Sequence, residues 1–264
     1  MIPAQPSRTA VRTALRRAAH QVLDTPLVFE DPLAITMIGK EVAAALLKAP
    51  EKLESQAGAP ALRAFLAVRS RIAEAAIEKA RELVTLLTKW QQRSRLYLVA
   101  FGDIQQQVLL TIPGPMRVVV YRRLMLRIAE RIGRARRAQA LVTGDVVGQV
   151  ASQTLENLAV VGAVTTMPLF RPLIGMDKDE ITAEAQKIGT YPISIIEDQD
   201  CCTLFTPRNP VTRGRLAEVQ TLEGALPIEE MVDRAVKSAV VEDFDFPVIT
   251  SVGKTGGVEW EPAE

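Results

Sequence analysis

The sequence AQALVTGDVVGQ, residues 138–149, carries a short apolar run directly into a glycine turn. The run AQALVT is strand-like, and Thr143, Gly144 and Asp145 leave its carboxyl end. Ligands of open α/β sheets bind beyond such strand ends, with anions near the N-termini of the helices that follow. The residues alone leave open a second interpretation, in which this is only a tight strand–helix turn.

Two further strand-like runs flank this one. Residues 96–101 (LYLVAF) come before it, and residues 168–174 (PLFRPLI) come after it, where the prolines favour an edge position. Helical patterns cover residues 118–132 and run from 149 to about 164 between these strands. Strands that alternate with helices predict an α/β fold with a parallel sheet.

A helix is also predicted after the third strand. Asp177 is placed as its N-cap with Glu180 three residues on, and Gly189 stands where a left-handed C-cap would fall. Lys178 follows the cap, where a cation is electrostatically misplaced. It is therefore either a solvated surface lysine or a functional group.

The chain on either side of this core has a different character. Residues 7–47 and 59–90 read as helices, and His20, the only histidine, is expected to be structural because it lies beside apolar residues. A helical pattern follows from about residue 222. The polar stretch 241–264 is expected to be loosely ordered.

The composition is that of a soluble globular protein. Of 264 residues, 48% are hydrophobic and 24% charged, and no apolar run reaches the roughly 20 residues of a membrane helix. The only cysteines, Cys201 and Cys202, are neighbours, which argues against a disulfide framework and suits a reducing, cytoplasmic location. No metal-binding motif is predicted.

Basic residues are concentrated in one block. Between Arg117 and Arg137 there are eight arginines against one acid, Glu130. Such a block can supply the phosphate contacts of a nucleic-acid interface, but by itself it favours a solvated helix face whose arginine stems cover apolar neighbours.

Six segments carry a resemblance to a known family: LYLVAFGDIQQQV, YRRLMLRIAERI, ALVTGDVVGQVASQTLENL, LFRPLIGMDKDEI, IGTYPISI and DCCTLFTPRNPVTR. Over residues 78–216 the chain resembles the PP-loop sulfurtransferases that make 4-thiouridine in tRNA and serve thiamine thiazole synthesis. The resemblance implies an incomplete Rossmann-like parallel sheet of the PP-loop ATPase type, preceded by an all-helical segment. It also implies tRNA and a sulfur donor such as a cysteine desulfurase as partners.

The resemblance assigns roles to particular residues. It implies that ATP, with magnesium, is bound by the residues of the glycine turn and the helix start after it: Thr143, Gly144, Asp145, Gln149 and Ser152. Lys178 corresponds to the catalytic lysine, which would stabilise charge on phosphate or acyl-adenylate oxygens. The arginine helix would contact tRNA phosphates through Arg122, Arg123, Arg127 and Arg131.

Cys201 and Cys202 form the predicted site with the most specific chemistry. A thiolate can accept sulfane sulfur as a persulfide and deliver it to an activated carbon, while a second thiol resolves the product as a disulfide. Adjacent cysteines bond each other only through a strained ring, so sulfur relay or a bond to a second chain is favoured over a structural bridge. Two reduced, buried thiols are the alternative. The resemblance favours sulfur chemistry with Cys202 ahead of Cys201, although Glu197 stands where the family usually has proline.

The phosphate loop of the resembled family, S-G-G-x-D-S, is absent, since no Ser-Gly-Gly occurs in the sequence. Use of ATP is therefore expected to be impaired. The central strands that would carry the loop are missing as well. The strands at 96–101 and 138–143 should then close up on each other or pair with another chain, which makes a homo-oligomer an expected outcome.

Residues 6–77 resemble the N-terminal cap helices of S-adenosylmethionine-dependent O-methyltransferases of the leucine carboxyl methyltransferase type, through PSRTAVRTALRRAAHQVLDTPLVFEDPLA and ALRAFLAVRSRIAEAA. The glycine-rich cofactor loop of that family does not follow, which argues against methyl transfer. The predicted division is 1–77, 78–220 and 221–264. Besides tRNA sulfur transfer, a non-catalytic RNA-binding or partner module and a chimeric chain without evolved function stay open.

Overall fold

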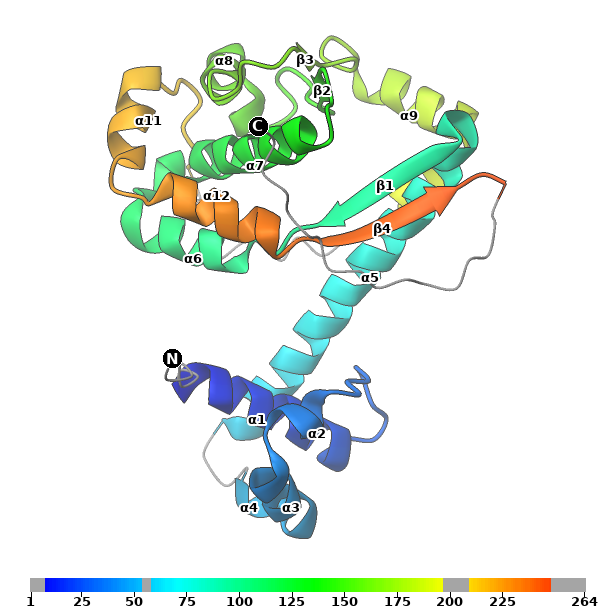
Figure 1. The fold of residues 1–264 in the computed structure, drawn as a ribbon, viewed down its shortest axis with the longest axis vertical. Helices are drawn as coiled ribbons and strands as arrows, with labels where there is room; N and C mark the ends of the chain where they lie inside the picture. The colour runs from blue at the N-terminus through cyan, green and yellow to red at the C-terminus, as the bar shows by residue number, and fades with distance from the viewer. Residues whose placement is uncertain (1–7, 54–57, 197–208, 248–264) are drawn as a thin grey trace. The chain divides into compact units, whose positions relative to one another are not determined.

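The computed structural model describes residues 8–53, 58–196 and 209–247 (Figure 1). Within these residues it divides into two compact units, one ending at Ala80 and the other beginning at Arg81. The boundary lies inside the long helix α5 (Ala59–Gln91), which runs from the first unit into the second. The predicted boundaries after residues 77 and 220 stay a prediction.

The first unit is entirely helical over its described residues. It contains α1 (Arg8–Leu23), α2 (Ala34–Met37), α3 (Lys40–Lys48), α4 (Pro50–Leu53) and the first part of α5. Its small core is made of four fully buried side chains: Ala18, Ala19, Ala34 and Leu46. Within the region 7–47 that reads as helices, α2 is only four residues long. Gly39 adopts a φ of 82°, which ends this segment and lets α3 begin.

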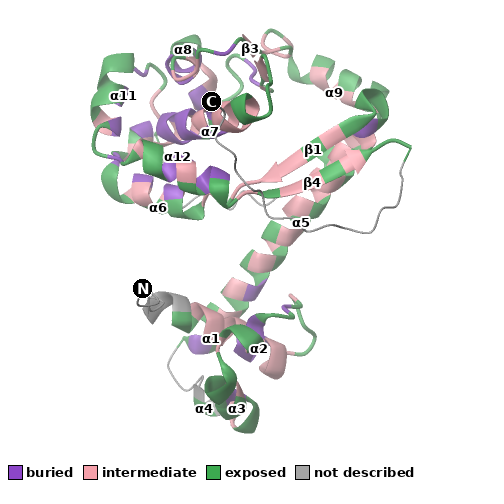
Figure 2. Ribbon diagram, viewed as in Figure 1, coloured by how far each residue is buried: buried purple, intermediate pink, exposed green. Residues whose placement is uncertain are grey.

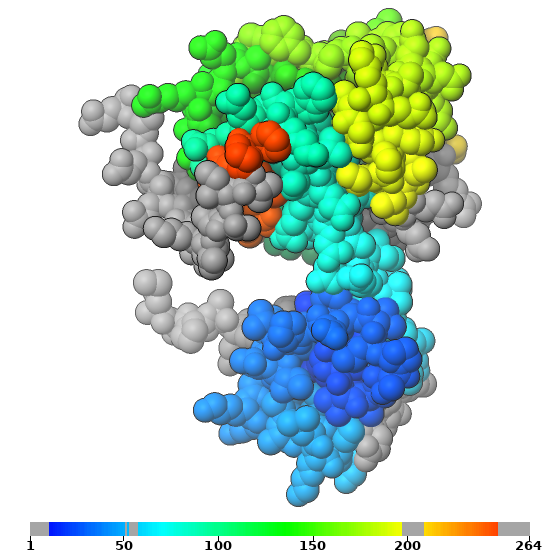
Figure 3. Space-filling view, turned by 90° about the vertical axis from the view of Figure 1, so that its right-hand side faces the viewer, coloured from blue at the N-terminus to red at the C-terminus, as the bar shows by residue number. Residues whose placement is uncertain are grey.

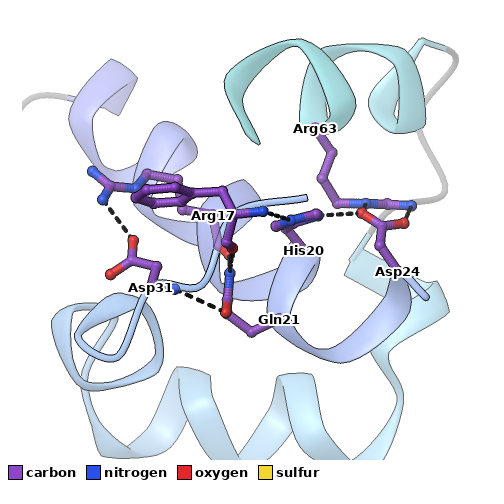
Figure 4. Close-up of polar contacts among 7 residues, drawn as sticks. Arg17, His20, Gln21, Asp24, Asp31 and Arg63 are labelled. Atoms are coloured by element: carbon purple, nitrogen blue, oxygen red, sulfur yellow. Dashed lines mark hydrogen bonds and ion pairs between the residues drawn. The ribbon is translucent and has the colours of Figure 1, made fainter. Parts of the chain in front are cut away.

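His20 is structural, as the sequence indicates (Figure 4). It is 2% exposed, and its Nε2 accepts a hydrogen bond from the Phe29 backbone N–H at 3.2 Å. Its Nδ1 lies 2.6 Å from an Asp24 carboxylate oxygen, and Arg63 binds the same carboxylate through two hydrogen bonds of 2.9 Å. The histidine therefore ties α1 to the loop after it and to α5.

The second unit holds all the strands that occur in the described residues. Its elements are β1 (Arg93–Leu98), α6 (Gly102–Thr111), the 3-10 turn η1 (Gly114–Met116), α7 (Arg117–Ala135), β2 (Leu141–Val142), η2 (Ala151–Gln153), α8 (Leu155–Gly162), β3 (Leu169–Phe170), α9 (Lys178–Lys187), α10 (Tyr191–Ser194), α11 (Leu216–Glu223), α12 (Ile228–Lys237) and β4 (Val240–Asp245). The predicted α/β class is confirmed.

Helix α7 is the centre of the core of this unit. Its buried side chains include Val119, Val120 and Leu124, and it packs against α6, α8 and α12. Figure 2 shows the buried residues gathered along α7 and along the faces of its neighbours that meet it. The helix predicted over 118–132 is thus confirmed, with three further residues at its carboxyl end.

The strands form two separate pairs. The parallel pair joins β2 to β3, with Leu141 opposite Leu169, as the sequence predicts. The antiparallel pair joins β1 to β4, with Arg95 opposite Asp243. The expectation that residues 241–264 are loosely ordered is wrong for the strand Val240–Asp245. The long-range partner β1 orders it, with help from the Arg95–Asp243 and Arg93–Asp245 ion pairs.

The β1–β4 pair also shows how β1 finds a partner although the central strands of the resembled fold are missing. Strand β1 begins at Arg93, three residues before the predicted start, and takes its partner from the C-terminal part of the chain. The predicted closure of β1 onto β2 does not occur. Because β4 supplies backbone groups to one side of β1, that edge needs no central strand.

Helix α9 confirms the capping prediction in detail. The Asp177 carboxylate accepts hydrogen bonds from the backbone N–H groups of Asp179 and Glu180, and the Glu180 side chain accepts one from the Asp177 N–H. Gly189 follows with a φ of 80°, and a Cβ built there would lie 3.8 Å from Leu86. The C-terminal end of α9 therefore lies beside α5, and Figure 3 shows the two segments in contact (yellow and cyan).

Helix α8 begins later than predicted. The pattern from residue 149 predicts a helix start near Ser152, but the chain forms only the short turn η2 there. Thr154 is the actual N-cap, and its hydroxyl accepts a hydrogen bond from the Asn157 N–H at 3.2 Å.

None of the helices in the described parts of the chain is long and apolar enough to cross a membrane.

Candidate functional site

The candidate site is the turn at the carboxyl end of β2. The Thr143 N–H donates to the Phe170 carbonyl at 3.0 Å, and the Val147 N–H donates to the Ile174 carbonyl at 3.1 Å. These two bonds continue the parallel pairing beyond the strands. Asp145 therefore lies between two residues, Thr143 and Val147, whose backbone N–H groups are both hydrogen-bonded to the neighbouring segment.

Asp145 is a buried carboxylate with three side-chain partners. Its side chain is 7% exposed, accepts a hydrogen bond from the Thr143 hydroxyl at 2.7 Å and one from Arg171 Nε at 3.0 Å, and forms an ion pair with Arg122. Burial raises the pKa of this carboxyl, but the Thr143 hydroxyl and the charges of Arg171 and Arg122 outweigh burial and hold the pKa below its ordinary value. The carboxylate is therefore fixed in its ionised form.

A second set of bonds closes the loop over this turn. The Gln153 side-chain oxygen accepts from the Val146 N–H, and the Gln153 carbonyl accepts from the Gly148 N–H, both at 3.0 Å. Gly148 has a φ of 77°, a conformation that favours glycine. Arg122 also donates to the Ser152 carbonyl at 3.0 Å, so one guanidinium binds both ends of the loop.

Asn157 connects the loop to a distant part of the chain. It is fully buried, and its side-chain nitrogen donates to the carbonyls of Ala151 at 2.9 Å and Val211 at 2.8 Å. Its side-chain oxygen accepts from the Gly214 N–H at 2.9 Å. Both the nitrogen and the oxygen of the Asn157 side chain are thus hydrogen-bonded to the backbone, and they fix the loop beside residues 211–214.

A cavity of about 240 Å³ lies against this turn. Arg122, Thr143 and Asp145 provide its polar wall. Its apolar wall comes from α7, α8 and β3: Met125, Leu126, Ala129, Val161 and Leu169. The cavity therefore sits beyond the carboxyl end of the parallel pair, where open α/β sheets bind ligands.

Comparison with known families decides what kind of protein this is. The model of the family described as thiamine biosynthesis protein (ThiI) matches residues 56–228, which include the turn at Asp145 and both cysteines. The chain belongs to the ThiI family. The match begins at residue 56, earlier than the predicted start at residue 78, and covers all of α5.

Curated relatives support the same assignment. A probable tRNA sulfurtransferase of Thermus thermophilus is 54% identical over 170 residues, covering 64% of this chain and 42% of the relative. The corresponding protein of Acetivibrio thermocellus is 44% identical over 168 residues, with 64% and 43% covered. The chain thus spans less than half the length of these relatives.

A solved structure gives the same result for the fold. The crystal structure of a 4-thiouridine synthetase–RNA complex with bound ATP is similar with a TM-score of 0.62 and 41% identity. The similarity covers 64% of this chain and 45% of that one. The identity is high enough for the shared fold to reflect shared ancestry within the ThiI family.

The structure brings some of the predicted nucleotide residues together. Thr143 and Asp145 are hydrogen-bonded to each other, and Ser152 joins them through Arg122. Gly144 and Gln149 lie exposed on the same loop. Sequence reasoning missed Arg171, although it stands directly after β3, and it assigned Arg122 to tRNA rather than to this turn.

The lysine predicted to be catalytic does not line this cavity. Lys178 is exposed at the first position of α9 and does not line it. Cys201 and Cys202 lie outside the described residues. No cluster of three metal-ligating side chains (His, Cys, Asp or Glu) occurs within residues 8–53, 58–196 and 209–247.

The predicted phosphate-binding arginines are engaged within the chain. Arg123 is 2% exposed, and together with Arg127 it binds the Glu223 carboxylate. Arg131 pairs with Glu229 and Asp233 of α12. This geometry favours a structural role for Arg123 over the expected phosphate contact, because only 2% of its side chain is exposed.

Proposed function

We propose that this chain is a tRNA sulfurtransferase-like protein that carries sulfur as a persulfide on Cys202. The observation that supports the proposal most strongly is the ThiI family match over residues 56–228, which includes Cys201, Cys202 and the turn at Asp145. The identity of 54% to a probable tRNA sulfurtransferase over 170 residues points to the same chemistry.

The chemical step at Cys202 is a thiol–persulfide exchange. The Cys202 thiolate attacks the outer sulfur of a persulfide on the donor, the donor's sulfur–sulfur bond breaks, and the donor leaves as a thiolate. The product is a persulfide on Cys202, and no net oxidation or reduction takes place. Once the outer sulfur has bonded to an activated carbon, the Cys201 thiolate or a thiol of a second chain would attack the Cys202 sulfur. A disulfide to Cys202 forms, the bond between Cys202 and the transferred sulfur breaks, and that sulfur stays on the carbon.

The residues that the structure describes do not form a complete ATP site. The cavity at Asp145, about 240 Å³, is smaller than the roughly 300–1,000 Å³ of ordinary ligand pockets. Arg122 and Arg171 are both engaged by the single carboxylate of Asp145, and the sequence has no S-G-G-x-D-S loop. We therefore assign no ATP-dependent or magnesium-dependent step to this chain alone, although an ATP-bound structure is known for a related synthetase.

tRNA is the proposed acceptor of the sulfur. A related synthetase has been solved in complex with RNA. Of the four arginines predicted to contact phosphate, Arg131 is the most accessible, with 40% of its side chain exposed. Because it shares its charge with Glu229 and Asp233, we expect weak, salt-sensitive binding. The proposed sulfur donor is a cysteine desulfurase.

Radiolabelled sulfur tests this proposal. The full chain is incubated with a cysteine desulfurase and radiolabelled cysteine and then separated without reductant. The wild-type chain and Cys201→Ser should carry the label, and Cys202→Ser should not. Lys178→Ala should also carry it, because Lys178 would act on the acceptor. Label that is absent from the wild type, or equal in Cys202→Ser, would overturn the proposal.

Two finer proposals concern the rest of the chain. We infer that the helices of residues 6–77 share their origin with methyltransferase cap helices, and that S-adenosylmethionine is not bound because the glycine-rich loop does not follow them. Self-association through the edge of β1 opposite β4 would explain a homo-oligomer. Calorimetry with S-adenosylmethionine and sedimentation of the purified chain test these two points separately.

A further inference from the structure

A second and larger cavity lies in the same unit as the turn at Asp145. It has a volume of about 570 Å³ and is bounded by the end of β1, the residues after it and α7. Its lining residues are Tyr97, Val99, Phe101, Met125, Ile128, Ala129, Ile132, Gly133 and Arg136. Only Met125 and Ala129 are shared with the cavity at Asp145, so most of the wall belongs to this cavity alone.

The wall is apolar over most of its area. Val99 and Phe101 line one side, while Ile128 and Ile132 line the other from successive turns of α7. Ile128 is buried in the main core, and Phe101 is held edge-on against Tyr121, with ring centroids 6.2 Å apart. The walls are therefore fixed by packing, and the volume is in the usual range for a small-molecule site.

One charged group stands at the edge of this apolar space. Arg136, which follows α7, donates a hydrogen bond from Nε to the Tyr97 hydroxyl at 2.6 Å, and its guanidinium carbon lies 5.9 Å from the Tyr97 ring centroid. The bond and the ring contact fix the guanidinium beside the cavity. Its terminal nitrogens make no hydrogen bond to any residue within the described parts of the chain.

The neighbouring carboxylate of Asp243 does not form an ion pair with Arg136. The Asp243 carboxylate of β4 feels the charge of Arg136, but Arg95 holds it through two hydrogen bonds of 2.5 and 2.9 Å. Arg136 thus differs from Arg123, Arg127 and Arg131, each of which binds a carboxylate directly. An apolar cavity with one available guanidinium matches a ligand that has an apolar body and a single negative group.

We propose that this cavity binds small amphipathic anions, in which a planar aromatic body fills the space along α7 and one sulfonate or carboxylate binds Arg136. The site shares no lining residue with the turn at Asp145. It therefore goes beyond the proposed sulfur transfer and does not depend on it.

Fluorescence titration with two dyes tests the proposal on the full chain. The probe 8-anilinonaphthalene-1-sulfonate carries the required anion, and N-phenyl-1-naphthylamine has a similar aromatic body without charge. Both should bind at one site per chain. Arg136→Gln should weaken the sulfonate about tenfold, since a charge-assisted bond is lost, and should change binding of the neutral dye less than about twofold.

Two further variants complete the test. Ala129→Phe places a ring in the cavity and should remove binding of both dyes, with circular dichroism and thermal melting to verify the fold. Arg137→Gln removes an equal charge from the next residue, which does not line the cavity, and should leave both affinities unchanged. Equal effects of Arg136→Gln and Arg137→Gln on the sulfonate, equal weakening of both dyes by Arg136→Gln, or full binding by a folded Ala129→Phe would each overturn the proposal.

Discussion

Arg123 of α7 and Glu223 of α11 form a buried bidentate ion pair. The guanidinium donates from Nε and Nη2 to the two carboxylate oxygens at 2.8 and 2.9 Å, and the two side chains are 2% and 6% exposed. Arg127 binds the same carboxylate through two more hydrogen bonds of 2.8 and 2.9 Å. One carboxylate thus joins two turns of the central helix to a segment about a hundred residues away in the sequence.

Removing this carboxylate should be strongly destabilising. Glu223→Ala leaves the buried Arg123 without its partner, and we expect the free energy of unfolding to fall by about 3–5 kcal/mol. Glu230→Ala is the matched control, because Glu230 forms only an exposed ion pair with Arg234 and should cost at most about 1 kcal/mol. Urea unfolding measures both. Similar losses in the two variants would contradict the structural role of Glu223.

The same carboxylate should make stability depend on acid pH. Burial raises the pKa of Glu223, but the two arginines outweigh it and lower the pKa from 4.5 to about 2. A depressed folded-state pKa stabilises the fold above pH 4.5, and this contribution, about 3 kcal/mol in total, is lost as the pH falls toward 2. About 2 kcal/mol should be lost by pH 3.

Glu223→Gln isolates this effect. It cannot ionise, so its free energy of unfolding should fall less than that of the wild type between pH 6 and pH 3, by about the 2 kcal/mol that Glu223 contributes. Urea unfolding at the two pH values measures the difference. Parallel losses in both proteins would show that Glu223 is not the acid-sensitive group.

Gly214 is required for the close approach to Asn157. A Cβ at residue 214 would lie 2.7 Å from the Asn157 side-chain oxygen, so Gly214→Ala must displace the amide that binds Val211 and Ala151. We expect a loss of about 1–3 kcal/mol. Gly144→Ala is the control, because a Cβ there meets nothing within 4 Å. Thermal melting should separate the two variants, and equal melting temperatures would show that the loop at 211–214 adjusts freely.

The cap of α8 provides a smaller and local prediction. Thr154→Ala removes the hydroxyl that accepts from the Asn157 N–H and donates to the Thr212 carbonyl at 2.6 Å. The expected cost is about 1–2 kcal/mol. Thr221→Ala serves for comparison, because its hydroxyl bonds only within α11 and is exposed. Chemical unfolding of the two variants decides whether Thr154 has the larger effect.

Local signals explain what the sequence could predict of the fold. The capping pair Asp177 and Glu180 together with Gly189 fixes both ends of α9, and each signal acts within a few residues. Strand β4 has no such signal. It exists because Arg93 and Arg95 lie opposite acids about 150 residues away, and pairing at that distance cannot be inferred from local propensity.

The candidate site was predictable in part, for the same reason. The strand end and the glycine turn identify Thr143 and Asp145 from their immediate context. Arg122 and Arg171 stand 23 and 26 residues from Asp145, and only the fold brings them together. The arginine block resembled a phosphate-binding surface because its acidic partners come from α11 and α12, about a hundred residues further on.

Mass mapping of Cys202 tests the central claim of sulfur transfer most directly. The full chain is treated with a cysteine desulfurase and cysteine in the absence of nucleotide, alkylated and digested, and the peptide that contains Cys201 and Cys202 is fragmented. The account predicts one added sulfur atom on Cys202, formed without ATP and retained in Cys201→Ser. An unmodified peptide, or sulfur found only on Cys201, would contradict it.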